Sequence, residues 1–401
     1  MRIAFIAGAF PNLSQTFVLN QITGLIERGH EVDILASRPP KGGKEHPDVE
    51  AYGLMAHTYY WPKPSAFLGA LARHPAQTLS MIATSVLAAS ACGEPWSLEL
   101  VLKGILAGER GRYDIVLAHF GNLGREAQML RDMGALDARL VTVFHGYDMS
   151  VFPREKGPRV YDRLFGHGEL FLPISEHWRA LLVEMGAPER RLGVHRMGID
   201  CKRFAFAERA PDADGIVRIV TIGRLVEKKG VEYAIRAIAQ LVEHHQNIEY
   251  VVVGDGPLND GLQALIDELD VGKFVRLVGW MGQGEIVALL ASQHLLLAPS
   301  VTAANGDKEG IPVVLMEAMA MGLPVVSTLH SGIAELVEDG MSGYLVAERD
   351  VDALAERLEA LVCDPARWPA MGRAGRAMVE REFDVEVLND RLDALLQTLV
   401  S

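Results

Sequence analysis

The sequence contains few cysteines and no long apolar run. Three cysteines, Cys92, Cys201 and Cys363, stand far apart in 401 residues, and no CxxC pair is present. This spacing predicts neither a disulfide framework nor a zinc site, and it fits a reducing compartment. No apolar stretch reaches the roughly 18–20 residues that a membrane-spanning helix needs. The N-terminal segment MRIAFIAGAF has one basic residue and no cleavage site, so we expect no signal peptide and a cytoplasmic protein.

The sequence also lacks a basic surface. The net charge is -13, and residues 1–200 carry equal numbers of acidic and basic side chains, so the whole excess lies in residues 201–401. An acidic chain without a basic stripe is a poor candidate for binding nucleic acid. The neutral first half can approach an anionic membrane more easily than the second half.

A dinucleotide fingerprint is missing as well. In neither half is the first predicted strand followed by G-x-G-x-x-G, which argues against a nicotinamide dehydrogenase. A chain of 401 residues with 49% hydrophobic and 23% charged residues is typical of a globular protein with two domains. Strands and helices alternate in both halves, and periodicity is lost over residues 197–214. We therefore expect α/β domains at 1–200 and 201–383, followed by a helix at 384–401.

The most informative segment is KEGIPVVLMEAMAMGLPVV, residues 308–326. Pro312 suits the first turn of a helix predicted over residues 313–321, which Gly322 and Pro324 end. Glu309 then lies just before the helix and Glu317 lies on it. A helix N-terminus between the two carboxylates offers unpaired N–H groups to a phosphate.

Other polar and glycine residues follow predicted strands. Gly8 follows the first strand, His119 and His145 end two more, and GRLVEKKG (223–230) and GDGP (254–257) follow strands of the second half. Ligands bind at the carboxyl ends of such strands, and a glycine-rich turn with cations suits a diphosphate. Ser14 can cap a helix over residues 14–28. No metal-ligand spacing accompanies the histidines.

Residues 57–110 differ in character from the rest of the first half. Aromatic residues 59–61 precede two apolar segments with basic residues between them. We expect two or three helices packed on the first sheet. The alternative is an amphipathic surface that rests on a membrane.

These motifs together resemble the family-4 retaining glycosyltransferases of GT-B fold. The run 308–326, GRLVEKKG, AHFG, FHGYD and the closing HSGIAELVEDGMSGYLV all match the family pattern, and PNLSQTF resembles bacterial exopolysaccharide enzymes of the colanic-acid type. Met197 departs from the family, which has Asn there. The resemblance implies two Rossmann-like domains facing each other across a cleft, with a C-terminal helix crossing back to the first domain. It also implies sugar transfer from a nucleotide-diphosphate donor, UDP or GDP, to a saccharide or lipid-linked saccharide.

The resemblance also assigns residues to roles. The implied catalytic residues are Glu309, Arg224, Lys229 and His119. The implied donor-binding residues are Gly8, Gly223, Arg224, Lys229, Gly254, Trp280, Gly310, Ile311, Pro312, Val313 and Glu317. The implied acceptor-binding residues are Ser14, Gln15, Thr16, His119, His145 and Asp148.

We expect no metal and no cofactor other than the donor. Asp-x-Asp, the pattern of many metal-dependent transferases, occurs at 212–214 and 350–352, where it is better explained by a turn and a helix N-cap. The expected partners are the nucleotide sugar, the acceptor and the inner membrane leaflet as a peripheral contact. Two alternatives remain open: a non-transferring GT-B enzyme such as a sugar-nucleotide epimerase, and a catalytically silent nucleotide-sugar-binding protein.

Overall fold

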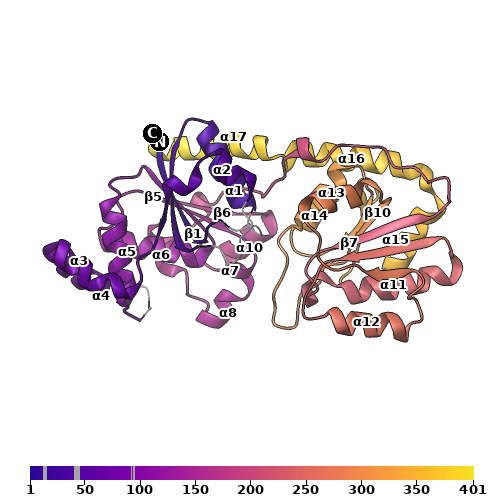
Figure 1. Cartoon of the computed structure of the whole chain (residues 1–401), viewed down its shortest axis with the longest axis horizontal. Coiled ribbons are helices and arrows are strands. Elements are labelled where there is room, and N and C mark those ends of the chain that lie inside the picture. The colour runs from indigo at the N-terminus through magenta and orange to yellow at the C-terminus, as the bar shows by residue number, and fades with distance from the viewer. Residues whose placement is uncertain (12–15, 40–45, 92, 94) are drawn as a thin grey trace. The chain divides into compact units, whose positions relative to one another are not determined.

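The computed structural model describes residues 1–11, 16–39, 46–91, 93 and 95–401. Internal contacts divide the chain into two compact units (Figure 1). Unit 1 comprises Met1–His195 and Leu388–Ser401, and unit 2 comprises Arg196–Val387. Both junctions lie within a few residues of the boundaries expected after residues 200 and 383.

The described part of unit 1 contains a six-stranded parallel sheet in the order β3-β2-β1-β4-β5-β6. Its central strands are apolar runs buried on both faces, as is usual for parallel sheets. The strands are β1 (Arg2–Ala9), β2 (Glu31–Arg38), β3 (Thr58–Tyr60), β4 (Ile115–His119), β5 (Arg139–Phe144) and β6 (Leu170–Pro173).

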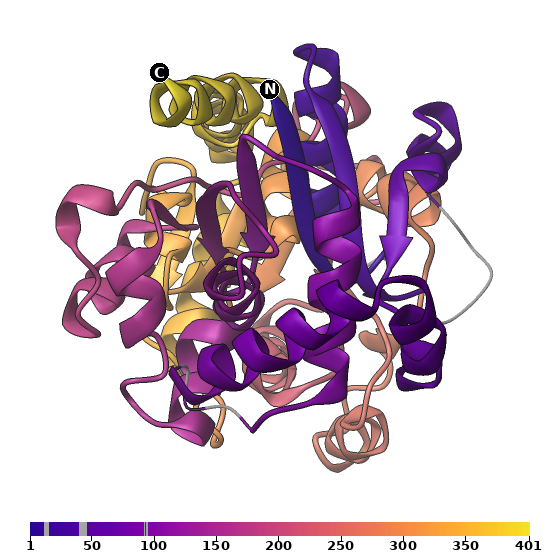
Figure 2. The same ribbon diagram turned by 90° about the vertical axis from the view of Figure 1, so that its left-hand side faces the viewer.

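Helices surround this sheet in the view of Figure 2. The region 57–110 contains α3, α4 and α5, which confirms the expected two or three helices, and it also contributes the edge strand β3, which the sequence did not predict. The α-helices of unit 1 are α1 (Thr16–Glu27), α2 (Pro47–Ala51), α3 (Phe67–Arg73), α4 (Pro75–Ala91), α5 (Leu98–Glu109), α6 (Gly121–Asp132), α7 (Tyr147–Ser150), α8 (Phe152–Lys156), α9 (Asp162–His167) and α10 (Glu176–Glu184).

Unit 2 is built on a second six-stranded parallel sheet in the order β12-β11-β10-β7-β8-β9. Its strands are β7 (Val217–Ile222), β8 (Ile248–Val253), β9 (Val275–Leu277), β10 (Leu295–Ala298), β11 (Val325–Thr328) and β12 (Gly343–Val346). Its α-helices are α11 (Val231–His244), α12 (Asn259–Glu268), α13 (Gln283–Ala291), α14 (Val313–Ala320), α15 (Val351–Cys363) and α16 (Trp368–Glu382).

The unit 2 sheet separates two apolar cores. Neighbouring residues of one strand point to opposite faces, so Ile219 packs with α11 and α15 while Val220 packs with α14. Helices therefore cover both faces of the sheet.

The C-terminal helix α17 (Val385–Val400) returns to unit 1 from Leu388 onward. Asn389 donates to the carbonyl of Asn20 at 3.1 Å, and a Cβ on Gly24 would lie 1.9 Å from Asn389 Nδ2, so only glycine fits there. His30 lies 2.7 Å from Asp393, and both chain ends lie close together (Figures 1 and 2). This return confirms the predicted crossing of the last helix to the first domain.

Each sheet reverses its strand order once, between β1 and β4 in unit 1 and between β7 and β10 in unit 2. Open α/β sheets bind ligands at such switch points, at the carboxyl ends of the strands. The functional residues are therefore expected at these two places.

Candidate functional site

The switch point of unit 2 carries two of the predicted residues. Lys229 ends a short 3₁₀ turn (Glu227–Lys229) after β7, and Glu309 lies in the loop after β10. Lys229 Nζ is 3.0 Å from Glu309 Oε2. The fold thus brings together a cation and a carboxylate that are 80 residues apart in sequence.

A second lysine also holds Glu309. Lys228 Nζ is 3.4 Å from Glu309 Oε1 and 3.1 Å from Asp307 Oδ2. Burial raises the pKa of Glu309, but Lys229 and Lys228 outweigh it and hold this pKa below its usual value. Glu309 is therefore ionised at neutral pH. Sequence reasoning missed Lys228 because the family motif assigns only the lysine next to the glycine.

The backbone of Glu309 is anchored by a buried histidine. Glu309 N–H donates to His330 Nε2 at 3.0 Å, so the ring proton is on Nδ1, which faces Glu348 Oε1 at 2.6 Å. Glu348 accepts hydrogen bonds from Thr302 N (2.7 Å) and Thr302 Oγ1 (3.1 Å). The His330 side chain is fully buried. His330 and Glu348 therefore position the loop that carries Glu309, and no local motif indicated this.

Three glycines bring the strand-end turns of unit 2 into close contact. A Cβ on Gly254 would lie 1.9 Å from the carbonyl oxygen of Gly223, and a Cβ on Gly230 would lie 1.9 Å from that of Pro299. Gly230 has φ +64°, which glycine adopts without strain. A Cβ on Gly223 would lie 3.1 Å from Lys229 Cε, so the Lys229 side chain packs across this turn.

Two predicted donor-binding side chains point outward from the same edge. The Arg224 side chain is exposed, and its guanidinium makes no hydrogen bond or ion pair with any residue that the structure describes. Trp280 is 68% exposed. Gly254 N–H donates to Gly279 O at 2.8 Å, which ties the GDGP turn to the segment beside Trp280. These groups can reach a ligand at the strand ends.

The helix that carries Glu317 has the predicted form. The sequence predicted a helix over 313–321, and α14 spans Val313–Ala320 with no side-chain cap. Its first N–H groups therefore have no partner within the helix. The side chains of Ile311 and Pro312 are buried, so these two residues can meet a ligand only through their backbone, whereas Val313 is half-buried.

Glu317 differs from Glu309 in having no counter-charge. Among the described residues its carboxylate has no hydrogen-bond or ion-pair partner. Burial raises the pKa of Glu317 to about 7. A buried carboxyl group without a partner is a candidate ligand contact.

The switch point of unit 1 carries the predicted histidine pair. His119 Nδ1 lies 3.1 Å from His145 Nε2, and the rings of Phe17 and Phe120 pack against His145. Burial lowers the pKa of His119 well below its usual value and that of His145 to about 3. Both rings are therefore neutral at pH 7. His119 Nε2 and His145 Nδ1 are buried and have no partner within the described residues.

Asp148 is buried between the two loops that carry these histidines. Its carboxylate accepts from Gly121 N–H at 2.8 Å and from His145 N–H at 3.0 Å. Burial raises the pKa of Asp148 to about 7 despite these bonds. Phe120, between His119 and Gly121, has φ +75°, a conformation that costs a non-glycine residue about 1–3 kcal/mol. Asp148 thus positions the loops, and its predicted contact with an acceptor stays a prediction.

Of the other predicted residues of unit 1, the structure describes Gly8 and Thr16 but not Ser14 and Gln15. Gly8 lies in β1, and a Cβ there would meet no described atom within 4 Å. Thr16 begins α1, whereas Ser14 and Gln15 lie outside the described residues. Sequence reasoning missed His195, which is buried and whose charge would lower the pKa of both His119 and His145. His195 lies in a loop without a motif.

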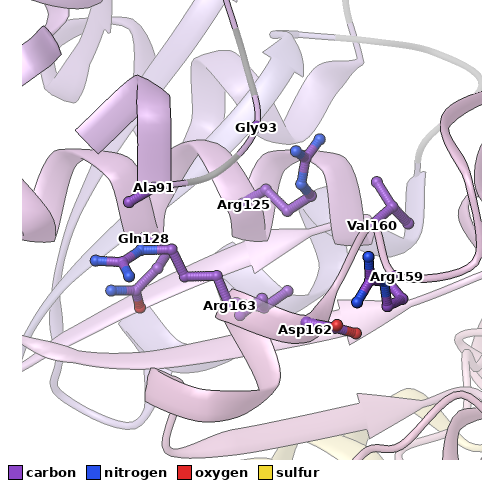
Figure 3. Close-up of a pocket in the computed structure, with 9 residues that line it drawn as sticks. Ala91, Gly93, Arg125, Gln128, Arg159, Val160, Asp162 and Arg163 are labelled. Atoms are coloured by element: carbon purple, nitrogen blue, oxygen red, sulfur yellow. The ribbon is translucent and has the colours of Figure 1, made fainter. Parts of the chain in front are cut away.

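Unit 1 also contains a hollow of about 270 Å³ that no predicted residue lines. Arg125, Arg159 and Arg163 contribute to its wall together with Asp162 (Figure 3). Arg163 pairs with Asp132 at 2.6 Å, and Arg125 lies over the ring of Phe152. Two of the three arginines therefore already contact groups of the protein itself: Arg163 contacts a carboxylate and Arg125 contacts an aromatic ring.

The Asp-x-Asp patterns are used inside the protein. Asp212 Oδ2 is 2.6 Å from Arg218 Nη1, and Asp214 also pairs with Arg218. Asp350 caps α15 by accepting from Ala353 N–H at 3.0 Å, which confirms the predicted N-cap. Asp212 and Asp214 are exposed and lie at a turn, as the sequence predicted, and they also form ion pairs with Arg218.

No helix in the described ranges is both long and apolar enough to cross a membrane. The helices of region 57–110 nevertheless expose large apolar side chains. Leu68 on α3 is 76% exposed, and Leu79 and Leu87 on α4 are 61% and 72% exposed.

Comparison with known proteins assigns both halves of the chain. Residues 14–198 match the family described as Glycosyl transferase 4-like domain, and residues 206–378 match Glycosyl transferases group 1. A protein of Escherichia coli (strain K12) named for colanic acid biosynthesis, the glycosyltransferase WcaL, is 39% identical over 411 residues and covers 100% of both chains. The amylovoran biosynthesis glycosyltransferase AmsK of Erwinia amylovora is 39% identical over 412 residues, again with 100% of both chains covered.

A solved structure shares the fold. Anabaena Alr3699/HepE in complex with UDP superposes with a TM-score of 0.73 at 20% identity, covering 99% of this chain and 100% of that one. Full-length identity of 39% and two separate six-stranded parallel sheets together show that this chain belongs to the GT-B glycosyltransferases, among relatives of bacterial exopolysaccharide biosynthesis.

Proposed function

We propose that this protein transfers a sugar from a nucleotide-diphosphate sugar to a hydroxyl of a saccharide acceptor, with retention at the anomeric carbon and without a metal ion. The observation that carries the proposal is the cluster of Lys228, Lys229 and Glu309 beside the uncapped N-terminus of α14. It combines cations for a diphosphate with a carboxylate for the sugar.

The donor is expected to lie on unit 2. Exposed Arg224 and the helix N-terminus supply positive groups, and Glu317 supplies an acceptor for ribose hydroxyls. Anabaena Alr3699/HepE was solved with UDP and with UDP-glucose, so UDP-sugars are tested beside GDP-sugars.

In the proposed reaction, the bond between the anomeric carbon and the diphosphate breaks and negative charge grows on the leaving oxygens. Arg224 and Lys229 stabilise that charge, each contributing about 3 kcal/mol if it acts as a preorganised donor. Glu309, already ionised, orients the sugar and stabilises positive charge at the anomeric carbon. The leaving phosphate takes the proton of the acceptor hydroxyl as that oxygen forms the new bond on the same face.

Unit 1 is proposed to hold the acceptor. The unpartnered nitrogens of neutral His119 and His145 can each exchange a hydrogen bond with a sugar hydroxyl. A lipid-linked acceptor would bring the protein to the membrane surface, and the exposed leucines Leu79 and Leu87 on α4 suit shallow insertion.

The first test is thermal stabilisation by UDP-, GDP- and ADP-sugars in the presence of EDTA. A donor at about 100 times its dissociation constant adds about 2.7 kcal/mol of stability. We expect one donor to stabilise the wild type and to stabilise Glu317→Gln much less. The configuration of the product, followed by NMR, then tests retention. Release of an altered sugar without any acceptor would replace the proposal with an epimerase.

Membrane contact is tested by flotation with anionic vesicles. The double variant Leu79→Ser/Leu87→Ser should lose co-flotation, whereas Leu258→Ser, which removes an exposed leucine from unit 2, should keep it. Equal flotation of both variants would contradict the α4 assignment.

A further inference from the structure

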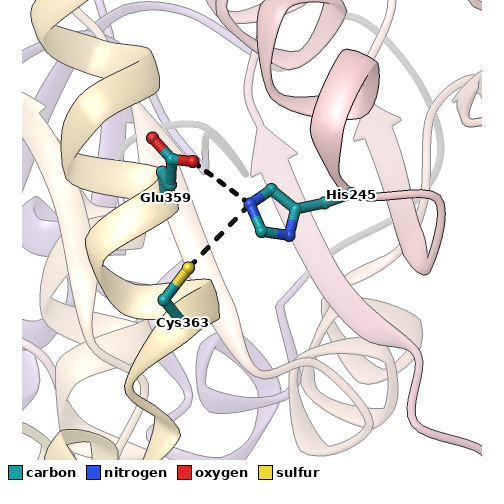
Figure 4. Close-up of side chains that lie close together, drawn as sticks. All are labelled: His245, Glu359 and Cys363. Carbon is teal, nitrogen blue, oxygen red and sulfur yellow. Dashed lines mark hydrogen bonds and ion pairs between the residues drawn. The ribbon is translucent and has the colours of Figure 1, made fainter.

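Three potential metal ligands meet on unit 2 (Figure 4). His245 directly follows α11, and Glu359 and Cys363 lie on α15. His245 Nε2 is 3.3 Å from Glu359 Oε1 and 3.9 Å from Cys363 Sγ. One ligand atom from each residue lies within 4.8 Å of the other two.

The donor set suits zinc. Zinc binds thiolate sulfur at about 2.3 Å and imidazole nitrogen or carboxylate oxygen at about 2.0–2.2 Å, usually in a tetrahedron. Tetrahedral angles then separate the ligand atoms by roughly 3.3–3.6 Å. The observed nitrogen–oxygen distance already matches, and the nitrogen–sulfur distance is a few tenths of an ångström too long. The oxygen and the sulfur lie within 4.8 Å of each other, and the exposed side chain of Cys363 can move to close this distance.

The helix geometry preorganises two of the ligands. Glu359 and Cys363 are four residues apart on α15, so they lie on one face, one turn above the other. The residue after α11 supplies the third ligand from a neighbouring element that packs on α15. An ion pair between His245 and Glu359 alone would not need the thiol of Cys363 beside it.

The cluster is remote from the donor site of unit 2. His245 lies between the end of α11 and the start of β8, and therefore at the amino ends of the strands. Arg224, Lys229 and Glu309 all follow carboxyl ends. A metal held by His245 would accordingly join α11 to α15 and would not touch the transferred sugar.

We propose that His245, Glu359 and Cys363 bind one Zn²⁺ through imidazole, carboxylate and thiolate, with water in the fourth position, and that the ion fastens α11 to α15. This zinc site goes beyond the proposed transferase reaction and does not depend on it. The spacing of the cysteines predicted no zinc site, because His245 stands 114 residues before Glu359 and 118 before Cys363.

The test titrates the full chain with Zn²⁺ against a chromophoric chelator and with Co²⁺ by absorption. We expect one ion per chain and, with Co²⁺, a thiolate-to-metal charge-transfer band. Cys363→Ser should abolish the band, and Cys363→Ser, His245→Ala and Glu359→Gln should each weaken Zn²⁺ binding about tenfold or more, since each removes a direct ligand.

Matched controls are available near His245 and Glu359. His244→Ala and Glu356→Gln remove exposed neighbours outside the cluster and should leave the affinity unchanged. Zn²⁺ should raise the melting temperature of the wild type and of both controls, but not of Cys363→Ser. Zn²⁺ binding to Cys363→Ser with the affinity of the wild type, or a Co²⁺ complex of the wild type without the charge-transfer band, would overturn the proposal. Sugar transfer by zinc-free protein should stay at the wild-type rate, which separates this test from that of the proposed function.

Discussion

Replacing Glu317 by glutamine should stabilise the donor-free protein. The carboxyl group of the half-buried Glu317 on α14 has no partner among the described residues, and its desolvation raises its pKa from 4.5 to about 7. The charged form is therefore disfavoured in the folded state. Glutamine has nearly the same shape and carries no charge at any pH.

The size and sign of the effect follow from the two pKa values. Because the folded pKa lies above the unfolded one, the folded state binds more protons than the unfolded chain between pH 4.5 and about 7. Stability is lost as the pH rises through this range, and the loss reaches about 3 kcal/mol above pH 7. Below pH 4.5 the effect vanishes, because Glu317 is protonated in both states.

Thermal unfolding from pH 5 to pH 8 measures this directly. The gap between Glu317→Gln and wild type should widen with pH to roughly 6–12 °C, at about 2–4 °C per kcal/mol for a unit of this size. Glu356→Gln, which changes an exposed glutamate on α15, should melt with the wild type at every pH. A Glu317→Gln protein that melts at or below the wild type at pH 8 would refute the reasoning.

The donor should narrow the gap between the two proteins. Ribose hydroxyls that donate to the Glu317 carboxylate stabilise its charged form, so a saturating donor should raise the melting temperature of the wild type more than that of Glu317→Gln. Equal stabilisation of both proteins would contradict the ribose contact and leave the effect of burial intact.

Three further outcomes are expected. Arg224→Ala should lower turnover about 100-fold, since one preorganised donor to the leaving diphosphate is worth about 3 kcal/mol. Arg236→Ala, on the exposed face of α11, should keep the wild-type turnover. Equal steady-state rates of the two variants would show that Arg224 is not part of the site. His330→Phe keeps a ring but leaves the N–H of Glu309 without its acceptor, so kcat should fall with little change in donor KM; a change in KM alone would contradict the positioning role. Donor binding near pH 7 should release a fraction of a proton from Glu317, and binding heats that do not vary with the ionisation enthalpy of the buffer would argue against this.

Local patterns were sufficient to predict most elements of the two sheets. The strand expected at 216–221 is Val217–Ile222, and the helix expected at 313–321 is Val313–Ala320. Parallel strands that are buried on both faces are continuous apolar runs, and glycine or proline ends them. The short edge strand Thr58–Tyr60 was not predicted, because an edge strand of three residues has too little alternation to be recognised in the sequence.

The site was predictable only where a residue belongs to a motif. Glu309 and Lys229 were found this way, but their contact with Lys228 and the support of Glu309 by His330 depend on distances between separate loops. Asp148 shows the reverse limit. The family resemblance implied an acceptor contact for this residue, which stays a prediction, but the motif cannot tell that the carboxylate turns inward to accept two backbone N–H groups.

The two carboxylates of the central segment show why such details matter for function. Glu309 has two lysines beside it, so its charge is stabilised before any donor arrives. Glu317 has no lysine beside it. Its desolvation lowers the stability of the protein, and no described residue offsets this cost with a hydrogen bond or an ion pair. In unit 1 the outer nitrogens of His119 and His145 are likewise buried and unpartnered. Buried polar atoms that lack partners are unfavourable unless a ligand completes them, and they occur here at both switch points, where an α/β sheet binds its ligands. A sequence cannot reveal this feature, because it depends on what the fold leaves unfilled around a side chain.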